Sequence, residues 1–192
     1  MDRQILTSRI RLATLPIVFM AGLLVSASGL EAQASFTGRV FTGPGTANGY
    51  GWGIGGDVGV QFPFLFGLPH MAGLFVNYHF GNDFLDDELG ERVEQRIVFY
   101  GPQAAAVWYD KAFFLRGSGQ IGAATVRHQV EGEEAVTQTR FMLGSGIMIG
   151  KRFGNVVLSI EPWFPIVINS DYTKASFALY INLVYEVPLI PG

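Results

Sequence analysis

The sequence predicts an all-β protein: an eight-stranded antiparallel up-and-down transmembrane β-barrel with a plugged polar lumen, preceded by a cleaved signal peptide. Three observations lead to this fold class. Long runs alternate apolar and polar residues with a period of two, which is the side-chain period of a strand. The runs are long enough to cross a bilayer, for which a tilted strand needs roughly 9–11 residues. The apolar residues are spread along the chain, and no uninterrupted apolar run of helical-span length follows the N-terminus.

The clearest alternation lies in residues 97–126, where two runs flank a tight turn at Asp110-Lys111. In the second run, Leu115 belongs to an apolar face and Arg116 belongs to the opposite, polar face. The first run alternates in the same way and places Gln103 opposite its apolar face. Each run is about twice as long as the common strand of roughly 5–6 residues. A pair of this length with one apolar face suits a membrane-spanning barrel.

The composition narrows the functional class. The chain has 192 residues, which is enough for one domain. Hydrophobic residues make up 49% of it and charged residues 15%, which is an apolar composition for a soluble protein. Its formal net charge of −3 and the lack of a basic stripe argue against a nucleic-acid partner. The absence of cysteine excludes disulfides, thiolate metal sites and a lipid-modified N-terminal cysteine.

Residues 1–34 are typical of a secretory signal peptide. Basic residues precede an apolar segment, and Ala32 and Ala34 form the small-residue pattern of a cleavage site. Cleavage there makes Ser35 the first residue of a single barrel domain, 35–192. The alternative is an uncleaved N-terminal membrane anchor.

The rest of the chain divides into eight strand-like runs separated by turns and polar loops. Pro-Gly and Asn-Gly pairs mark the first loop, and an acidic loop over 81–91 follows the third run. A second acidic loop, 129–134, follows the fifth run. The predicted strands are 36–42, 52–62, 71–80, the two runs of 97–126, 136–150, 156–168 and 176–187.

Three prolines lie within the predicted strands, where a residue without a backbone N–H interrupts the hydrogen-bonded ladder. Pro102 cannot donate a backbone hydrogen bond, and a closed barrel has no free edge, so we expect a β-bulge at Pro102. Pro162 and Pro165 are expected to bend or shorten the seventh strand. The connections after the first, third, fifth and seventh strands are polar and mostly longer than the others. This asymmetry fits long loops outside the cell and short turns inside.

One face of the predicted sheet is polar and carries charges of both signs. Charged groups removed from bulk water need partners, so equal numbers of arginines and carboxylates indicate a paired network. Eight strands enclose only enough space for side chains, which predicts a plugged interior and not an open pore. The alternative is a soluble, exported carrier barrel of the lipocalin kind, with this polar face in water. The predicted lumen charge network consists of Arg39, Asp57, Arg116, Arg140, Glu161 and Glu186.

The opposite face is apolar and is expected to contact lipid. Aromatic residues gather near both ends of the runs, as in the girdles that flank the apolar band of membrane barrels. Ordinary packing is enough to explain any one of these aromatic residues. The prediction of a girdle therefore depends on their occurrence at both rims. The predicted girdle consists of Trp52, Tyr78, Phe80 and Phe177 at one rim and Phe62, Trp108, Phe113 and Tyr185 at the other.

The chain resembles the small outer-membrane β-barrel proteins of the OmpA/OmpX type over essentially all of 35–187. The likeness rests on the N-terminal signal, the eight runs, the loop asymmetry and the closing run SFALYINLVYEV. It implies a monomer in the outer membrane of a Gram-negative envelope, with lipid and the barrel insertion machinery as partners. It also implies a structural or surface-interaction role through the outward loops. Family members commonly end on an aromatic residue, whereas this chain continues past Tyr185 to Pro-Leu-Ile-Pro-Gly.

No catalytic, cofactor or metal site is predicted. The enzymatic alternative is a barrel that remodels lipid A with His, Ser and an acidic residue. His79 and His128 lie near the loop ends of their runs, but no local signature places a Ser beside either of them. Glu161 and Glu186 could form an acid–base pair, although ion pairing with the arginines fits them better. The acidic loop at 81–91 lacks the EF-hand spacing of a calcium site.

Overall fold

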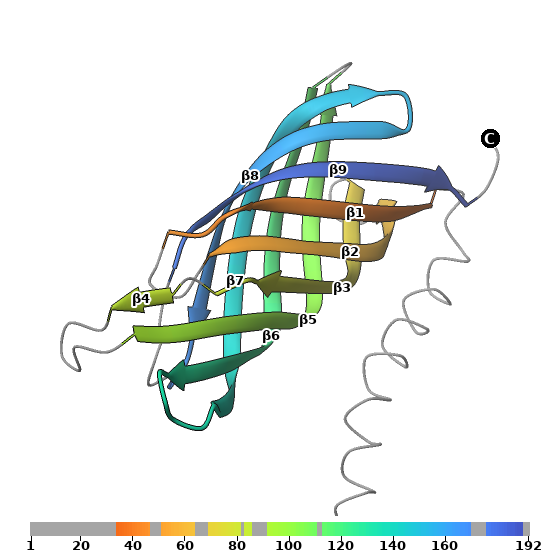
Figure 1. The fold of residues 1–192 in the computed structure, drawn as a ribbon. Coiled ribbons are helices and arrows are strands. Elements are labelled where there is room, and N and C mark those ends of the chain that lie inside the picture. The colour runs from red at the N-terminus through yellow and green to blue at the C-terminus, as the bar shows by residue number, and fades with distance from the viewer. Residues whose placement is uncertain are drawn as a thin grey trace, which may run out of the picture.

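The computed structural model describes residues 34–46, 51–63, 69–81, 83–85, 92–110, 113–169 and 176–189. All of the predicted signal peptide except Ala34 lies outside these residues, so the cleavage site stays a prediction. Eight strands of the described part form a closed antiparallel barrel (Figure 1). The same part contains no helix that is long and apolar enough to cross a membrane.

The strands are β1 (Ser35–Pro44), β2 (Trp52–Pro63), β3 (Pro69–His79), β4 (Asp83–Leu85), β5 (Arg92–Asp110), β6 (Phe113–Val130), β7 (Val136–Phe153), β8 (Val156–Val167) and β9 (Ala178–Pro188). Their order in the sheet is β3-β2-β1-β9-β8-β7-β6-β5-β4, and the pairing of β3 with β5 closes the barrel. We call the end at which β1 stops and β2 starts the loop end, and the opposite end the turn end. The predicted up-and-down barrel topology is therefore confirmed.

The eight predicted runs correspond to the eight barrel strands, and the largest differences in their bounds lie on β5, β6 and β7. β5 begins at Arg92 and β6 continues to Val130, whereas the predicted pair begins at residue 97 and ends at 126. Polar residues appear on the outward face beyond those limits, so the apolar alternation that defined the runs is lost. The sequence does not predict β4, because three residues carry too little pattern.

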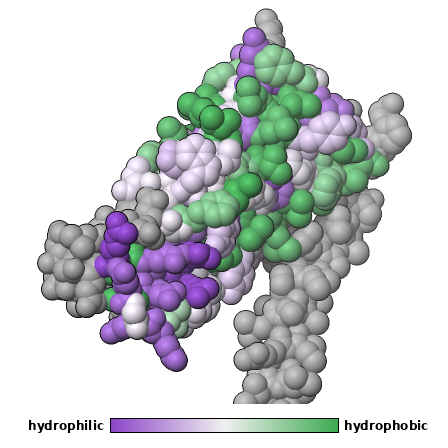
Figure 2. All heavy atoms as spheres, viewed as in Figure 1, coloured by the Kyte–Doolittle hydropathy of each residue, from purple (hydrophilic) through white to green (hydrophobic). Residues whose placement is uncertain are grey.

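β5, β6 and β7 project beyond the barrel wall at the loop end. The β3–β5 ladder stops at Ile97 and the β7–β8 ladder stops at Met142, yet β5 and β6 remain paired as far as Val93 and Val130. Figure 1 shows this projection at the lower left, and Figure 2 shows that its visible surface is mostly hydrophilic, unlike the green surface of the barrel wall. We define the outer sheet as residues 83–85, 92–96, 127–130 and 136–140.

Pro102 interrupts one ladder without changing its register. The β3–β5 ladder runs continuously through Pro102, but the β5–β6 ladder pauses at Gly101 and Pro102, opposite Ile121 and Gly122. Two residues are skipped on each strand, so the predicted β-bulge is wrong. A missing N–H removes a ladder bond, and this loss does not require an extra residue. Pro162 lies at a similar pause between β7 and β8.

We expect Gly122→Ala to lower the free energy of unfolding by about 1–3 kcal/mol, because the strands approach closely at the pause. A Cβ on Gly122 would lie 2.1 Å from the Tyr100 carbonyl oxygen and 3.0 Å from the Gly101 Cα atom. Gly119 on the same strand is the matched control, since among the described residues a Cβ there meets nothing within 4 Å. Gly119→Ala is expected to be neutral or stabilising by up to about 1 kcal/mol. Denaturant unfolding in detergent micelles measures both, and equal effects contradict the close approach.

Candidate functional site: the filled lumen

The barrel strands turn their charged side chains inward and their apolar side chains outward. Arg116 on β6 is 2% exposed and Glu161 on β8 is 1% exposed, whereas Ile160, the neighbour of Glu161, is 54% exposed. Successive residues alternate between lumen and exterior because each strand is pleated. The lipocalin-like alternative required Arg116 and Glu161 to lie in water, and this burial contradicts it.

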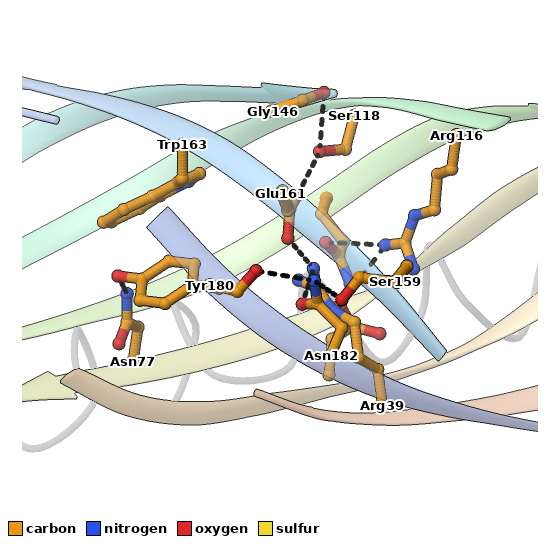
Figure 3. Close-up of polar contacts among 12 residues, drawn as sticks. Arg39, Asn77, Arg116, Ser118, Gly146, Ser159, Glu161, Trp163, Tyr180 and Asn182 are labelled. Carbon is orange, nitrogen blue, oxygen red and sulfur yellow. Dashed lines mark hydrogen bonds and ion pairs between the residues drawn. The ribbon is translucent and has the colours of Figure 1, made fainter. Parts of the chain in front are cut away.

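Arg39 on β1 joins two carboxylates inside the lumen. Its Nε donates to Oδ2 of Asp57 at 2.5 Å, and its Nη1 donates to the Glu161 carboxylate and, at 3.2 Å, to Oδ1 of Asn182. The Arg39 side chain is 3% exposed, and both carboxylates are buried as completely. Figure 3 shows Arg39 and Glu161 converging from β1 and β8, on either side of β9.

Arg116 on β6 reaches the same carboxylate from across the barrel. Its Nη2 donates to Oδ2 of Asp57 at 3.3 Å and to Oε1 of Gln103 at 3.2 Å. We call Arg39, Asp57, Arg116 and Glu161 the central charge cluster. Its two positive and two negative charges balance, which matters because an unpaired buried charge costs several kcal/mol. The cluster links four strands of the barrel, namely β1, β2, β6 and β8.

Glu186 belongs to a second cluster at the turn end. Its carboxylate accepts a hydrogen bond from the Tyr109 hydroxyl, and its Oε2 lies 3.2 Å from Nη2 of Arg152. The guanidinium of Arg152 lies over the Tyr109 ring, 4.8 Å from its centroid, and Nε2 of Gln61 donates to the Tyr109 hydroxyl at 2.9 Å. These four residues, the turn-end cluster, bring together side chains from four strands across this end of the lumen.

Arg140 lies at the other end of the barrel. It shares the inward face of β7 with Met142, but it stands beyond the end of the β7–β8 ladder and is half-buried. Its Nε donates to the Asn169 carbonyl oxygen at 2.8 Å. The structure therefore distributes the six predicted network residues over three heights. The alternation of residues shows which face of the sheet a residue lies on. It does not show the position of that residue along the barrel axis, because that position depends on the register between strands.

Apolar side chains fill the lumen on both sides of the central charge cluster. The predicted charge network contains only polar members of the inward face, so these apolar layers are a new finding of the structure. Their signal lay in large apolar residues at inward positions, such as Phe99 and Met142. A layer towards the loop end contains Phe41, Phe75, Ile97, Phe99, Ala124, Val126, Met142, Trp163, Val167, Ala178 and Tyr180. A layer towards the turn end contains Val107, Phe114, Met148, Val157 and Val184.

His79 lies within the loop-end apolar layer. Its ring stacks on Trp163 at a centroid distance of 6.2 Å, and its Nε2 lies 2.8 Å from the Tyr180 hydroxyl. Ser118 instead contacts the central charge cluster, with Oγ 3.5 Å from Oε1 of Glu161. These contacts place the histidine and the serine in different layers of the lumen. No group of three or more His, Cys, Asp or Glu side chains in the described residues could hold a metal ion.

The predicted girdle residues lie at or near strand ends. At the loop end, Tyr78 packs edge-on against Phe80 at a centroid distance of 4.9 Å. At the turn end, Trp108 and Phe113 pack in the same manner at 5.8 Å. Both pairs lie on the outward parity of their strands, where amphipathic rings can meet a bilayer interface. The other predicted members are Trp52 and Phe177 at the loop end and Phe62 and Tyr185 at the turn end.

Solved outer-membrane barrels are similar to this chain in fold. The N-terminal β-barrel domain of Pseudomonas aeruginosa OprF superposes with a TM-score of 0.54 at 10% identity, covering 82% of this chain and 100% of that chain. A major outer membrane protein from Thermus thermophilus gives 0.54 at 12% identity, covering 80% and 99%. Neisserial surface protein A gives 0.50 at 10% identity, covering 81% and 97%. The chain has the fold of the small eight-stranded outer-membrane β-barrels.

The outer-membrane barrel fold is recognised through structure and not through sequence, since no protein-family model and no curated protein matches the chain. The predicted resemblance to OmpA/OmpX-type barrels is confirmed at the level of the fold. The structure adds to the predicted lumen two apolar layers that lie on either side of the central charge cluster.

Proposed function

We propose that the chain is a membrane-embedded barrel of the bacterial outer membrane, with a structural or surface-interaction role carried by its loop end. The observation that supports this most strongly is the inverted polarity of the barrel. Charged side chains such as Arg116 are buried in the lumen, and apolar side chains such as Ile181, which is 60% exposed, cover the wall. Soluble monomers rarely expose apolar surface of this extent, and lipid is the solvent that covers it without loss.

The filled lumen supports a role that does not depend on a pore. The central charge cluster is enclosed between two apolar layers, and the turn-end cluster lies across one end. The apolar layers interrupt any polar path for ions along the lumen, because each lies between the central charge cluster and one end of the barrel. The same packing argues for a non-enzymatic barrel, because His79 contacts Trp163 and Tyr180, whereas Ser118 contacts Glu161 in another layer.

The outer sheet is the surface that we assign to contacts outside the cell. It projects beyond the aromatic rim, and its outward face carries Arg92, Glu94 and Arg127 in place of the apolar residues of the wall. A closed barrel has no free edge for pairing with other chains, which supports a monomer in the membrane. Assembly there requires lipid and the barrel insertion machinery as partners.

Membrane integration has a direct test. We expect the full chain, expressed in a Gram-negative host, to remain in the membrane pellet after alkaline wash and to be released only by detergent. Its folded form should migrate differently from its heat-denatured form in gel electrophoresis, because a closed sheet resists detergent until it is heated. A protein recovered in the soluble periplasmic fraction contradicts the proposal.

Orientation has a separate test at two turns. Gly132 has φ 85° in the turn between β6 and β7, and Gly154 has φ 62° in the turn between β7 and β8, at opposite ends of the barrel. An epitope inserted after Gly132 should bind antibody on intact cells. An epitope inserted after Gly154 should bind only after the outer membrane is permeabilised. The reverse pattern contradicts an outward loop end.

The closed lumen is tested by conductance in planar bilayers. We expect no large, steady channel from the purified chain, because the lumen is filled with packed side chains. A general porin reconstituted by the same procedure is the positive control. A stable open channel at low voltage contradicts the filled lumen but leaves membrane integration untouched.

A further inference from the structure

Two arginines face each other on the outward surface of the outer sheet. Arg96 on β5 is the register partner of Arg127 on β6, and the side chains of both are exposed. Residues directly opposite in an antiparallel pair have Cβ atoms roughly 4.5–5.5 Å apart, and like charges at this spacing destabilise the sheet. Glu94 forms an ion pair with Arg96, so the charge of Arg127 is the one that an additional anion would compensate.

The pair stands directly beyond the apolar wall. Val98 is the last apolar residue on the outward face of β5, and Arg96 follows it at the next outward position, roughly 7 Å further along the strand. On β6 the last outward apolar residue is Ala123, and Thr125 separates it from Arg127. This height corresponds to the headgroup layer of a bilayer that covers the wall. Both side chains lie on the outward face of their strands and are exposed.

The nearby carboxylates leave donors available to an anion. Glu94 accepts from Nε of Arg96 at 2.5 Å and also pairs with its Nη2, but a guanidinium has five N–H donors in a fixed fork, so donors of Nη1 and Nη2 remain. Within the described part of the chain, no carboxylate lies within ion-pair distance of Arg127. Glu131, in the turn after β6, stands further from the apolar wall than the arginines do.

We propose that Arg96 and Arg127 together bind the phosphate of an anionic lipid headgroup in the outer leaflet; this proposal rests on the proposed membrane location. A phosphate between the two groups accepts charge-assisted hydrogen bonds from both and removes their mutual repulsion. The hydroxyls of Thr125 and Thr139, 3.0 Å apart on the same outward surface, lie one position closer to the wall, where a headgroup sugar or glycerol would lie. The position beside the wall favours a lipid over a soluble anion.

Native mass spectrometry of the full chain in mild detergent tests the pair. The protein is equilibrated with diphosphoryl lipid A, and with phosphatidylcholine as the zwitterionic comparison. The double variant Arg96→Gln/Arg127→Gln is expected to lose about tenfold in the ratio of lipid A to phosphatidylcholine retained, the scale of one or two charged hydrogen bonds. Arg96→Lys/Arg127→Lys keeps the charge without the planar fork and should lose less.

The control is Lys151→Gln, which removes an exposed positive charge at the turn end of β7, at the opposite end of the barrel from the pair. It is expected to retain lipid A within about twofold of the natural chain. An equal loss in the control, or no loss in the Arg96→Gln/Arg127→Gln variant, overturns the proposal. Displacement of lipid A by inorganic phosphate at equal concentration also overturns it, because the ligand is then a soluble anion. A chain that integrates into membranes but shows no lipid A preference defeats only this inference, whereas a soluble chain defeats the proposed function.

Discussion

Asp57→Ala is expected to lower the free energy of unfolding of the barrel by about 3–5 kcal/mol, the cost of removing one partner from a buried ion pair. Asp57 accepts from both Arg39 and Arg116, so its loss leaves two buried cations beside the single carboxylate of Glu161. The apolar layers on either side limit the access of water to the excess charge. The effect should exceed that of any single substitution on the exposed turns.

A compensating substitution separates charge imbalance from loss of packing. Asp57→Ala/Arg116→Met restores the balance, because Arg39 and Glu161 remain as one neutral pair. We expect this double variant to recover at least half of the lost free energy, since a buried ion pair is often replaced by apolar groups at little cost. Urea unfolding in detergent micelles, followed by tryptophan fluorescence, measures both variants. A double variant that is less stable than Asp57→Ala contradicts the account of the central charge cluster.

Ile160→Arg is expected to cost about 2–4 kcal/mol in a bilayer, because it places a charge near the middle of the lipid-facing wall. Ile160 lies on the outward face of β8 and is 54% exposed, so the substitution creates no clash inside the lumen. The expected cost in free energy therefore arises from the contact of the arginine with lipid hydrocarbon. It should therefore be much smaller when the surrounding solvent is water or a dynamic detergent shell.

Ile168 provides the matched control for this substitution. It lies on the same outward face, just beyond the loop end of β8, and it is also an exposed isoleucine. Ile168→Arg should cost only about 0–1 kcal/mol, because an arginine near the interface reaches the headgroups. Reversible unfolding from phosphatidylcholine vesicles gives both values. Equal costs at the two positions contradict a wall that is buried in lipid.

The sequence predicts correctly those features that depend on local alternation. Leu115 and Arg116 take opposite faces because neighbouring side chains on a pleated strand must do so, whatever the rest of the chain does. The barrel follows from eight such runs, each with one apolar face, since a sheet of this kind is stable in lipid only when it is closed. These inferences need no knowledge of which residues meet across the barrel.

Long-range features are beyond the reach of the pattern. Arg140 has the expected face but a different height from Arg116, because register depends on ladder partners far away in the chain. Inward residues such as Phe99 look like exceptions to a polar face until their packing against Trp163 is known. The alternation also does not predict the part of β5 that extends beyond the barrel wall. Its outward face is polar, so the strand continues where the apolar signal ends.

The central charge cluster also bears on the order of events during assembly. Arg39 and Asp57 are register partners in the first hairpin, 18 positions apart, so these two charges can pair within that hairpin alone. Glu161 meets Arg39 across 122 positions, and it arrives only with one of the last strands. The central charge cluster therefore becomes neutral as a whole only when β8 joins the sheet. A partly inserted chain that lacks β8 carries an excess positive charge at its centre, which disfavours its release into the lipid before the cylinder is complete.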